Sequence, residues 1–405
     1  MKTLAPLLFA FTLLASLASA CSDDDETVRI GALLPLTGAL QSYGEASEAA
    51  LELARDAINE DAGVKVELVV KDTTTDPDTA LAMLQELDDD GIKVVIGPYA
   101  SSEVAAVKEY ADANGIVLVS PLSTAGSLAI AGDNVYRFTP GDAKEAEAVA
   151  AVALDDGITT IVPVSRDDAG NLGLQSAMKP VFEAGGGTVL EGVTYAADED
   201  DFQSVIGEII AAVAAADSAP EETAVYLTAF DEVVDLLGVA ATLSNDVLRV
   251  QWYGSDSVAL SAGLIEDADA AGFATIVGYP SPILGLRDED EAKWQPVVDA
   301  LQGELGRRPD SFALAAYDAL VVAHMAIEEA GVDGDAGEIG AALVQAADGH
   351  VGLTGPTVLN EAGDRASASF DFWAVCPDGD GFTWTRTVSY AVAADGSAEV
   401  NRSEC

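Results

Sequence analysis

The chain has 405 residues, of which 49% are hydrophobic and 22% are charged, so it is long enough for two or three globular domains and is not disordered. Its formal net charge of −50 argues against nucleic acid and anionic lipid surfaces as partners, because both would be repelled. The acidic residues are spread along the whole chain, which suits a salty environment where counterions screen self-repulsion.

Residues 1–20 are predicted to be a signal peptide. Lys2 precedes an apolar run of export type, and small residues come directly before Cys21 and a polar stretch. This arrangement resembles a bacterial lipobox, although Ala18 stands where a lipobox usually has leucine. The resemblance implies that Cys21 becomes the acylated N-terminus, with 21–27 as the lipidated linker. The alternative is an ordinary secreted protein with an incidental cysteine.

An exported chain permits disulfides, so we hypothesise that the remaining cysteines, Cys376 and Cys405, pair near the C-terminus. We expect no spanning helix. The most apolar later stretch, residues 312–331, contains Asp318 and His324 and is typical of a buried soluble helix. We therefore expect an exported protein that is held by lipid on a membrane and faces the periplasm or the cell exterior.

From residue 28 the sequence alternates predicted strands with predicted helices. Strands are predicted at 28–36, 64–72, 93–97 and 116–120, and helices at 42–61, 76–91 and 101–115. Ser42 and Glu45 match the S-x-x-E capping box at a helix start. Asp76 is predicted to cap the second helix, which ends at Gly91. Such alternation is typical of a parallel sheet with helices on both faces.

A second series of this kind begins near residue 142 and continues to about residue 254. It is followed by helical patterns at 288–305 and 311–330, and then by an alternating, aromatic-rich tail at 357–392 that predicts antiparallel strands. Two α/β units without a Pro/Ser linker between them indicate a bilobed protein with a cleft.

Hydroxyl side chains follow two neighbouring predicted strands. Ser101 comes after "VVIGPYA", and Ser120, Ser123 and Thr124 follow the next strand. Ligands of open α/β sheets lie beyond the carboxyl ends of the strands, and a helix that begins at Ser101 offers free N–H groups there. These groups suit a carboxylate or another small anion. The alternative is that each hydroxyl only caps a helix or a turn.

Three motifs in this order, "GPYASS" (97–102), "SPLST" (120–124) and "GPTVLNEAGD" (355–364), resemble the solute-binding proteins of branched-chain amino acid ABC importers. That family is the leucine/isoleucine/valine-binding type of periplasmic binding protein, and the resemblance covers nearly all of the mature chain. It implies an α/β fold of two doubly wound lobes, with mainly parallel sheets and helices on both faces, joined by three hinge crossovers. The lobes are expected at 28–139 plus 280–354 and at 140–279 plus 355–405.

The resemblance also implies roles for individual residues. Ser101 would hold the ligand carboxylate, helped by the backbone N–H of Thr124, with Ser123 beside them. The carbonyl of Leu122 and the hydroxyl of Thr124 would face the ligand amine, which Asp256 in "WYGSDSV" would neutralise. The resemblance implies that two further residues, Tyr43 and Phe230, form aromatic walls of the ligand site. The simpler interpretations are a solvated Asp256 and packing roles for both aromatic residues.

One wall of the expected ligand site, near Gly170, departs from the family pattern. Where the family usually has an aromatic residue followed by glycine, this chain has Gly170, or a shifted loop in which Asn171 or Leu172 takes the role. The departure affects ligand specificity more than the fold.

The resemblance implies a monomeric protein that captures a small amino acid, or a related zwitterion or amide, and delivers it to an ABC permease. We expect no enzyme, metal or cofactor, because the sequence lacks a G-x-S-x-G elbow, a P-loop and a His/Cys cluster with metal spacing. The alternative is an envelope lipoprotein of the same fold that acts on protein partners, such as a cell-wall enzyme, and transports no solute.

Overall fold

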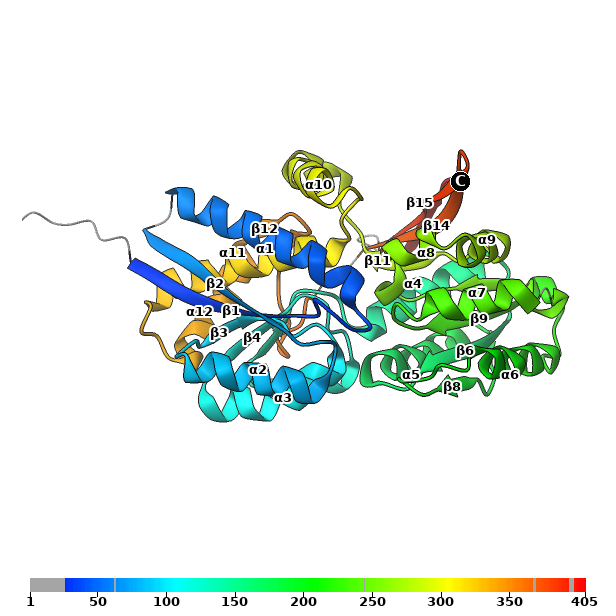
Figure 1. Ribbon diagram of the computed structural model, residues 1–405, viewed down its shortest axis with the longest axis horizontal. Helices are drawn as coiled ribbons and strands as arrows, with labels where there is room; N and C mark the ends of the chain where they lie inside the picture. Colours follow the sequence, from blue (N-terminus) through cyan, green and yellow to red (C-terminus); the bar gives the residue numbers. More distant parts are fainter. Residues whose placement is uncertain (1–25, 62, 244, 367–368, 393–396) are drawn as a thin grey trace, which may run out of the picture.

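The structure, a computed structural model, describes residues 26–61, 63–243, 245–366, 369–392 and 397–405. The predicted signal peptide and Cys21 lie outside these residues. The described chain forms two lobes that lie side by side along the long axis of the molecule (Figure 1).

The first lobe is built on a parallel sheet with strand order β2-β1-β3-β4-β5. Its strands are β1 (Glu26–Leu34), β2 (Val64–Asp72), β3 (Val94–Ile96), β4 (Val117–Ser120) and β5 (Val135–Arg137). One face is covered by α1 (Gln41–Asp61), α11 (Ser311–Ala330) and α12 (Ala336–Gly349), and the other by α2 (Pro77–Asp89) and α3 (Ser101–Asn114). Both faces are buried, which explains why the strands are nearly continuous apolar runs.

The second lobe repeats the plan with strand order β10-β9-β6-β7, and β8 also pairs with β6. Its strands are β6 (Thr160–Arg166), β7 (Thr188–Val189), β8 (Val193–Tyr195), β9 (Thr223–Thr228) and β10 (Gln251–Tyr253). Its helices are α4 (Asp142–Asp155), α5 (Ala169–Ala184), α6 (Phe202–Ala214), α7 (Val233–Leu243), α8 (Ala262–Glu266) and α9 (Ala268–Val277). Helices α4 and α5 pack on one face of the sheet, and α6, α7 and α9 pack on the other.

The tail forms an antiparallel sheet with strand order β11-β14-β15-β16, which confirms the antiparallel prediction. Its strands are β11 (Ser281–Leu284), β14 (Phe370–Asp378), β15 (Gly381–Val392) and β16 (Ala398–Arg402). The sheet packs against α4 and α9 of the second lobe. Cys376 in β14 is disulfide-bonded to Cys405, with the two Cα atoms 5.5 Å apart.

Along the described residues the chain passes between the lobes three times. It crosses from β5 to α4, from β11 to α10 (Glu291–Leu305), and from the short hairpin of β12 (Val351–Gly352) and β13 (Gly355–Pro356) to β14. Two predicted boundaries move as a result. Residues 281–284 belong to the tail sheet because β11 pairs with β14. Residues 357–366 stay with the first lobe because Asp364 is bound to Arg137 of β5.

Buried charge fixes this third crossover. The guanidinium of Arg137 donates to both carboxylate oxygens of Asp364 at 2.5 and 2.7 Å. The neighbouring Arg365 donates to the carbonyl of Phe138 at 3.1 Å and to the hydroxyl of Thr354 at 2.7 Å. A buried, bidentate ion pair of this kind requires a specific geometry of both side chains, so it sets where the chain leaves the first lobe.

Helix α11 is the apolar stretch that the sequence placed in a soluble core. Among the described residues it alone is long and apolar enough to cross a membrane, and most of its residues are buried in the first lobe. The Nε2 atom of His324 lies 2.8 Å from the carbonyl oxygen of Val64, so this histidine has a structural partner.

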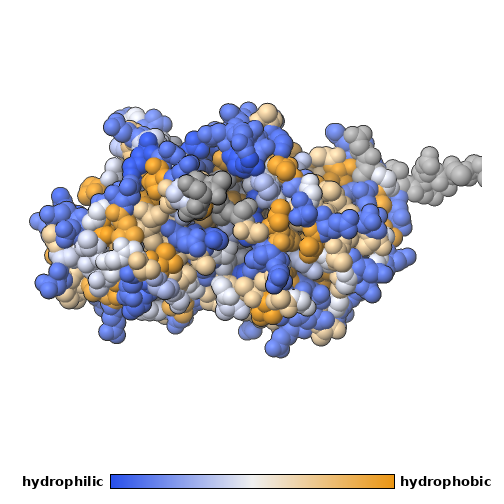
Figure 2. Space-filling view, turned by 180° about the vertical axis from the view of Figure 1, so that it is seen from behind, coloured by the Kyte–Doolittle hydropathy of each residue, from blue (hydrophilic) through white to orange (hydrophobic). Residues whose placement is uncertain are grey.

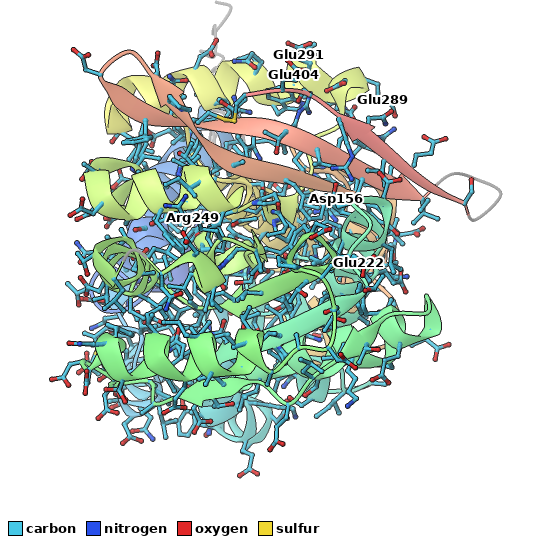
Figure 3. All side chains as sticks on the ribbon, turned by 90° about the vertical axis from the view of Figure 1, so that its right-hand side faces the viewer. Asp156, Glu222, Arg249, Glu289, Glu291 and Glu404 are labelled. Carbon is cyan, nitrogen blue, oxygen red and sulfur yellow. A yellow bond between two sulfur atoms is a disulfide. The ribbon has the colours of Figure 1, made fainter. Side chains whose placement is uncertain are left out.

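The outer surface is hydrophilic over most of the face in Figure 2, with apolar residues in scattered patches. Figure 3 shows exposed acids at the end of the second lobe, among them Asp156, Glu222 and Glu404. Because acidic residues occur along the whole sequence, both lobes carry them.

We predict that Asp364→Ala lowers the free energy of unfolding by about 3–5 kcal/mol, because it leaves the buried Arg137 guanidinium without its carboxylate. Urea denaturation measures the change, and Glu361→Ala, an exposed acid in the same loop, is the matched control. Equal stability of the two variants would contradict a structural role for the ion pair.

Candidate functional site

The carboxyl ends of β3 and β4 carry the predicted hydroxyl cluster. Ser101 is the first residue of α3, and its Oγ accepts a hydrogen bond from the N–H of Ala125 at 3.2 Å and lies 3.0 Å from Oγ of Ser123. The hydroxyl of Ser120 donates to the carbonyl of Pro98 at 2.6 Å and accepts from the N–H of Ser123 at 3.1 Å. These bonds hold the two strand ends together as one surface.

The second lobe closes over this surface and leaves a small cavity of about 10 Å³. The lining residues are Ala100, Ser101, Leu122, Thr124, Gly170, Asn171, Leu174, Phe230, Asp256 and Ser257. The structure therefore brings together Ser101, Leu122, Thr124, Phe230 and Asp256 from the predicted set. Ser123 lies behind the lining, in contact with Ser101.

Tyr43 lies outside the cavity lining, contrary to its expected place as a wall. Its ring packs edge-on against Phe312, with ring centroids 5.8 Å apart, and its hydroxyl donates to the carbonyl of Ala259 at 3.0 Å. Tyr43 is fully buried and joins the core of the first lobe to the second lobe. Phe230 does line the cavity, and the guanidinium of Arg166 lies 5.0 Å from its ring centroid.

The altered wall is formed by the start of α5. Asp168 caps this helix, and its carboxylate accepts from the N–H groups of Gly170 and Asn171 at 2.9 and 3.0 Å. Gly170 lies opposite Ser101, since a Cβ atom built on it would come within 3.6 Å of the serine Oγ. Asn171 lines the cavity, whereas Leu172 is exposed.

Two acids that the sequence analysis did not single out lie next to Asp256. Glu145, in the first turn of α4, accepts a hydrogen bond from the N–H of Asp256 at 3.2 Å, and its Oε1 lies 3.5 Å from the hydroxyl of Tyr226. Asp142, the first residue of α4, accepts from the N–H of Gly126 at 3.2 Å. Acids in a first helical turn are common for reasons of helix stability alone, so the sequence offered no signal that these two were buried.

Burial raises the pKa of all three carboxyl groups. The pKa of Asp256 rises to about 7, first because of burial and then because of the charge of Asp142. Burial raises the pKa of Asp142 to about 6. The pKa of Glu145 lies well above its usual range, because it is buried and faces Asp256 and Asp142.

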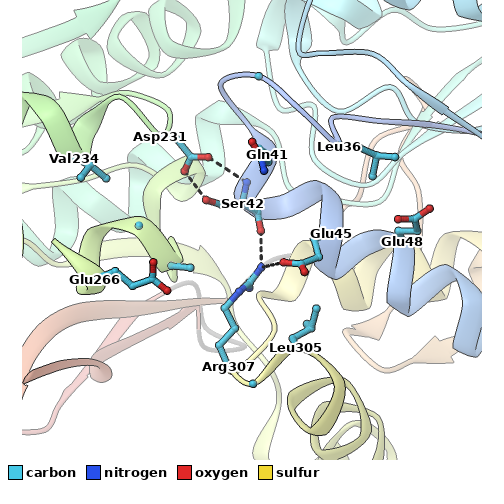
Figure 4. A pocket seen from close by; sticks show the side chains of 14 residues that line it. Leu36, Gln41, Ser42, Glu45, Glu48, Asp231, Val234, Glu266, Leu305 and Arg307 are labelled. Carbon is cyan, nitrogen blue, oxygen red and sulfur yellow. Dashed lines mark hydrogen bonds and ion pairs between the residues drawn. The ribbon is translucent and has the colours of Figure 1, made fainter.

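A separate contact joins the lobes at the rim, in the larger cavity of about 790 Å³ shown in Figure 4. The carboxylate of Asp231 in the second lobe accepts from the N–H and the hydroxyl of Ser42 at 3.1 and 2.8 Å, and from the hydroxyl of Ser261 at 3.1 Å. We call this group, Asp231 with Ser42 and Ser261, the rim latch. It places a carboxylate at the N-terminus of α1, where the helix dipole favours one.

The capping box predicted for Ser42 and Glu45 is therefore wrong. Ser42 is occupied by Asp231 from the other lobe, and Glu45 instead lies 3.3 Å from the guanidinium of Arg307. The same arginine donates to the carbonyl of Ser42 at 3.0 Å. A local pattern was overridden by a partner 189 residues away along the chain.

Comparison with known proteins identifies the relationship. A family model described as "Periplasmic binding protein" matches residues 27–378. The chain is similar to the Leu/Ile/Val-binding protein BraC3 of Rhizobium johnstonii, with 28% identity over 378 residues that cover 92% of this chain and 96% of the relative.

Solved structures show the same fold. A leucine-binding protein from Thermotoga maritima has a TM-score of 0.71 at 20% identity, covering 88% of this chain and 97% of that one. A solute-binding protein of an ABC transporter from Rhodopseudomonas palustris, in complex with 3,4-dihydroxybenzoic acid, has a TM-score of 0.75 at 19% identity, covering 91% of this chain and 98% of that one.

We predict that the ligand-free protein loses stability as the pH rises from about 5 to 8. Carboxyl groups titrate near pH 4 in an unfolded chain, whereas Asp142 and Asp256 titrate near pH 6 and 7 in the folded protein. The folded protein therefore binds protons more tightly, and this stabilisation is lost as the pH rises through the folded values. Thermal melts at high salt measure the slope, which Asp256→Asn flattens and the exposed-site control Asp380→Asn leaves unchanged. An unchanged slope in Asp256→Asn would contradict the assignment.

We predict that Asp231→Ala shifts the ligand-free protein toward an open arrangement of the lobes. The change removes the acceptor of the rim latch, whose hydrogen bonds to a charged group contribute roughly 1.5–3 kcal/mol each. Small-angle scattering should record a larger radius of gyration. Glu266→Ala, an exposed acid lining the same cavity, is the control, and the same radius in both variants would argue against the latch.

Proposed function

Because this chain belongs to the periplasmic binding protein family, we propose that it is an extracytoplasmic, lipid-anchored solute-binding protein. It captures a small amino acid, or a related zwitterion or amide, between its lobes and delivers it to an ABC importer. This is a binding role, and we assign no catalytic step to the chain.

The observation that carries the proposal is a cavity at the carboxyl ends of β3 and β4 that both lobes line, with unpaired polar atoms in its lining and directly behind it. Among the described residues, Oδ1 of Asn171 and Oε2 of Glu145 are buried without a hydrogen-bond partner. Buried polar atoms nearly always have partners, so unpaired ones around a cavity are the expected mark of a polar ligand.

In the proposed complex the first lobe binds one end of the ligand and the second lobe binds the other. The hydroxyl of Ser101 and the N–H of Thr124 face the ligand carboxylate. The carbonyl of Leu122 and the carboxylate of Asp256 face its amine, with Phe230 against its side chain. Charge-assisted bonds of this kind are strong in a cavity from which water is excluded.

Entry and release require the lobes to separate about the three crossovers. Opening breaks the rim latch and the bond from Tyr43 to the carbonyl of Ala259, both of which join the lobes. The ligand adds contacts that exist only in the closed form, so it shifts the population toward closure. We propose that the closed monomer is the form that a membrane permease binds.

We propose export and anchoring through Cys21, which lies outside the described residues. The disulfide between Cys376 and Cys405 supports export, because such bonds persist in oxidising compartments. The names of the relatives support an amino acid as the ligand, since one is a Leu/Ile/Val-binding protein and another a leucine-binding protein. A chain of the same fold is seen in complex with dihydroxybenzoic acid, so the fold by itself does not specify an amino acid as the solute.

A second candidate is the envelope lipoprotein that acts through protein partners. The small volume of the cavity, about 10 Å³, favours it, because such a protein needs no room for a solute. The unpaired atoms of Asn171 and Glu145 favour the solute-binding role, and we adopt that role on their account.

We predict that an amino acid or a related amine raises the melting temperature of the mature protein. At a hundredfold excess over the dissociation constant, the ligand stabilises by roughly 2.7 kcal/mol. Ser101→Ala and Asp256→Asn should abolish the shift in a thermal-shift screen of amino acids, amides and polyamines at high and low salt.

The matched control is Ser102→Ala, which changes the next hydroxyl of the same helix, at a position outside the cavity lining. It should keep the shift. If no small solute moves the melting temperature of the wild-type protein, the solute-binding role is wrong and the protein-partner role replaces it.

A further inference from the structure

Resting on the solute-binding function proposed above, we propose that the solute is a net cation rich in N–H donors, such as a basic amino acid or a diamine. We further propose that Glu145 and Asp142 select it together with Asp256. The three carboxyl groups are called the acid triad below.

The acid triad is buried where α4 meets the loop that follows β10. Asp142, Glu145 and Asp256 are 2%, 1% and 5% exposed. Asp142 lies against the start of α5, because a Cβ atom built on Gly173 would lie 2.2 Å from its Oδ2. Asp256 lines the cavity, and Glu145 lies directly behind it.

The protein supplies the triad with little compensating charge. Among the described residues, no Lys, Arg or His side chain lies within ion-pair distance of these three carboxylates. The guanidinium of Arg137 attracts Asp142 but is bound by both oxygens of Asp364. Arg166, the cation beside Phe230, is paired with Asp168 at 3.0 Å and with Glu232 at 3.2 Å. Buried charges are normally paired, so the missing cation is expected to come from the ligand.

The unpaired hydrogen-bonding atoms around the triad also favour a cationic ligand. Several buried oxygens lack a partner among the described residues, and three of them lie at or beside the acid triad: Oδ1 of Asp142, Oε2 of Glu145 and Oδ1 of Asn171. All three are acceptors, so they call for donors. A primary ammonium offers three N–H donors and a guanidinium offers five, whereas a carboxylate offers none.

Three backbone donors on this surface are engaged within the protein. The N–H of Ala125 donates to Ser101, that of Ser123 donates to Ser120, and that of Gly126 donates to Asp142. A ligand carboxylate therefore finds the hydroxyl of Ser101, the N–H of Thr124 and the N–H groups of the first turn of α3 as donors on this surface.

A metal ion is a poor substitute for this cation. In the part of the chain that the structure describes, no group of three or more His, Cys, Asp or Glu side chains is placed to hold a metal ion. The unpaired acceptors instead come from three separate places, the first residue and the first turn of α4 and the start of α5. Such a spread suits a polyatomic cation that donates in several directions.

The experiment compares ligands that share a carbon skeleton and differ in charge. Isothermal titration of the mature wild-type protein at pH 8 is done with ornithine against norvaline and with lysine against norleucine, and with putrescine as a cation that lacks a carboxylate. We expect at least one cationic ligand to bind about tenfold or more tightly than its neutral partner, equivalent to about 1.4 kcal/mol.

Two readouts tie the preference to the acid triad. Glu145→Gln keeps the shape of the side chain and should weaken the cationic ligand about tenfold while changing the neutral one less than about threefold. Glu147→Gln, an outward acid of the same helix that pairs with Lys144, is the control. Wild-type affinity for the cation should also fall from pH 8 to pH 5.5, because Asp256 and Asp142 become protonated beside Glu145, Tyr226 and Arg137.

The outcomes distinguish a failure of this inference from a failure of the proposed solute-binding function. Tighter binding of norvaline or norleucine than of every cation would overturn the inference and leave the solute-binding role intact. Equal loss of both ligand classes in Glu145→Gln would make Glu145 a structural residue only. If no solute binds at all, both the function and the inference fail. The wild-type ligand pairs and the pH dependence remain decisive even if Glu145→Gln does not fold.

Discussion

The central constraint on this structure is the cost of burying three carboxyl groups beside the cavity that both lobes line. Asp142, Glu145 and Asp256 are buried beside the cavity, and no ion pair to a described residue offsets the hydration that they lack there. Without a ligand the protein reduces the cost by keeping protons on the group, which is why their pKa values rise. A cation enclosed with them would remove the need for those protons. Closure, protonation and ligand charge are therefore one coupled equilibrium.

The rim latch and the hinge place this equilibrium under mechanical control. The Arg137–Asp364 pair and Arg365 tie the start of the third crossover to the first lobe, so in the proposed opening the lobes would move about the short connections beyond it. The latch, in contrast, joins one half-buried carboxylate to the start of α1 through hydrogen bonds and contains no ion pair. Strong buried pairs thus keep the axis of motion, and weaker polar contacts at the rim set the balance between open and closed forms.

Much of the fold could be predicted because its signals are local. The N-cap of Asp76, the helix that begins at Ser101 and the buried helix 311–330 follow from spacing and capping alone. The failures share one cause, which is a partner distant in sequence. Ser42 binds Asp231 instead of Glu45, Tyr43 is held by Ala259, and strand β11 pairs with β14. Glu145 was missed because an acid in a first helical turn has a sufficient local explanation, and only the fold shows that it faces Asp256.

The charge of the surface and the charge of the cavity act over different distances. The formal charge of −50 attracts cations to the molecule, but at 0.15 M salt its field decays over about 8 Å, and more quickly in stronger salt. The surface therefore affects how often ions arrive and does not choose among them. The buried carboxyl groups are screened far less, because the closed lobes exclude counterions from the cavity. Selection among solutes must then come from the few side chains around Asp256, whatever the salt outside, and replacing surface acids should leave that selection unchanged.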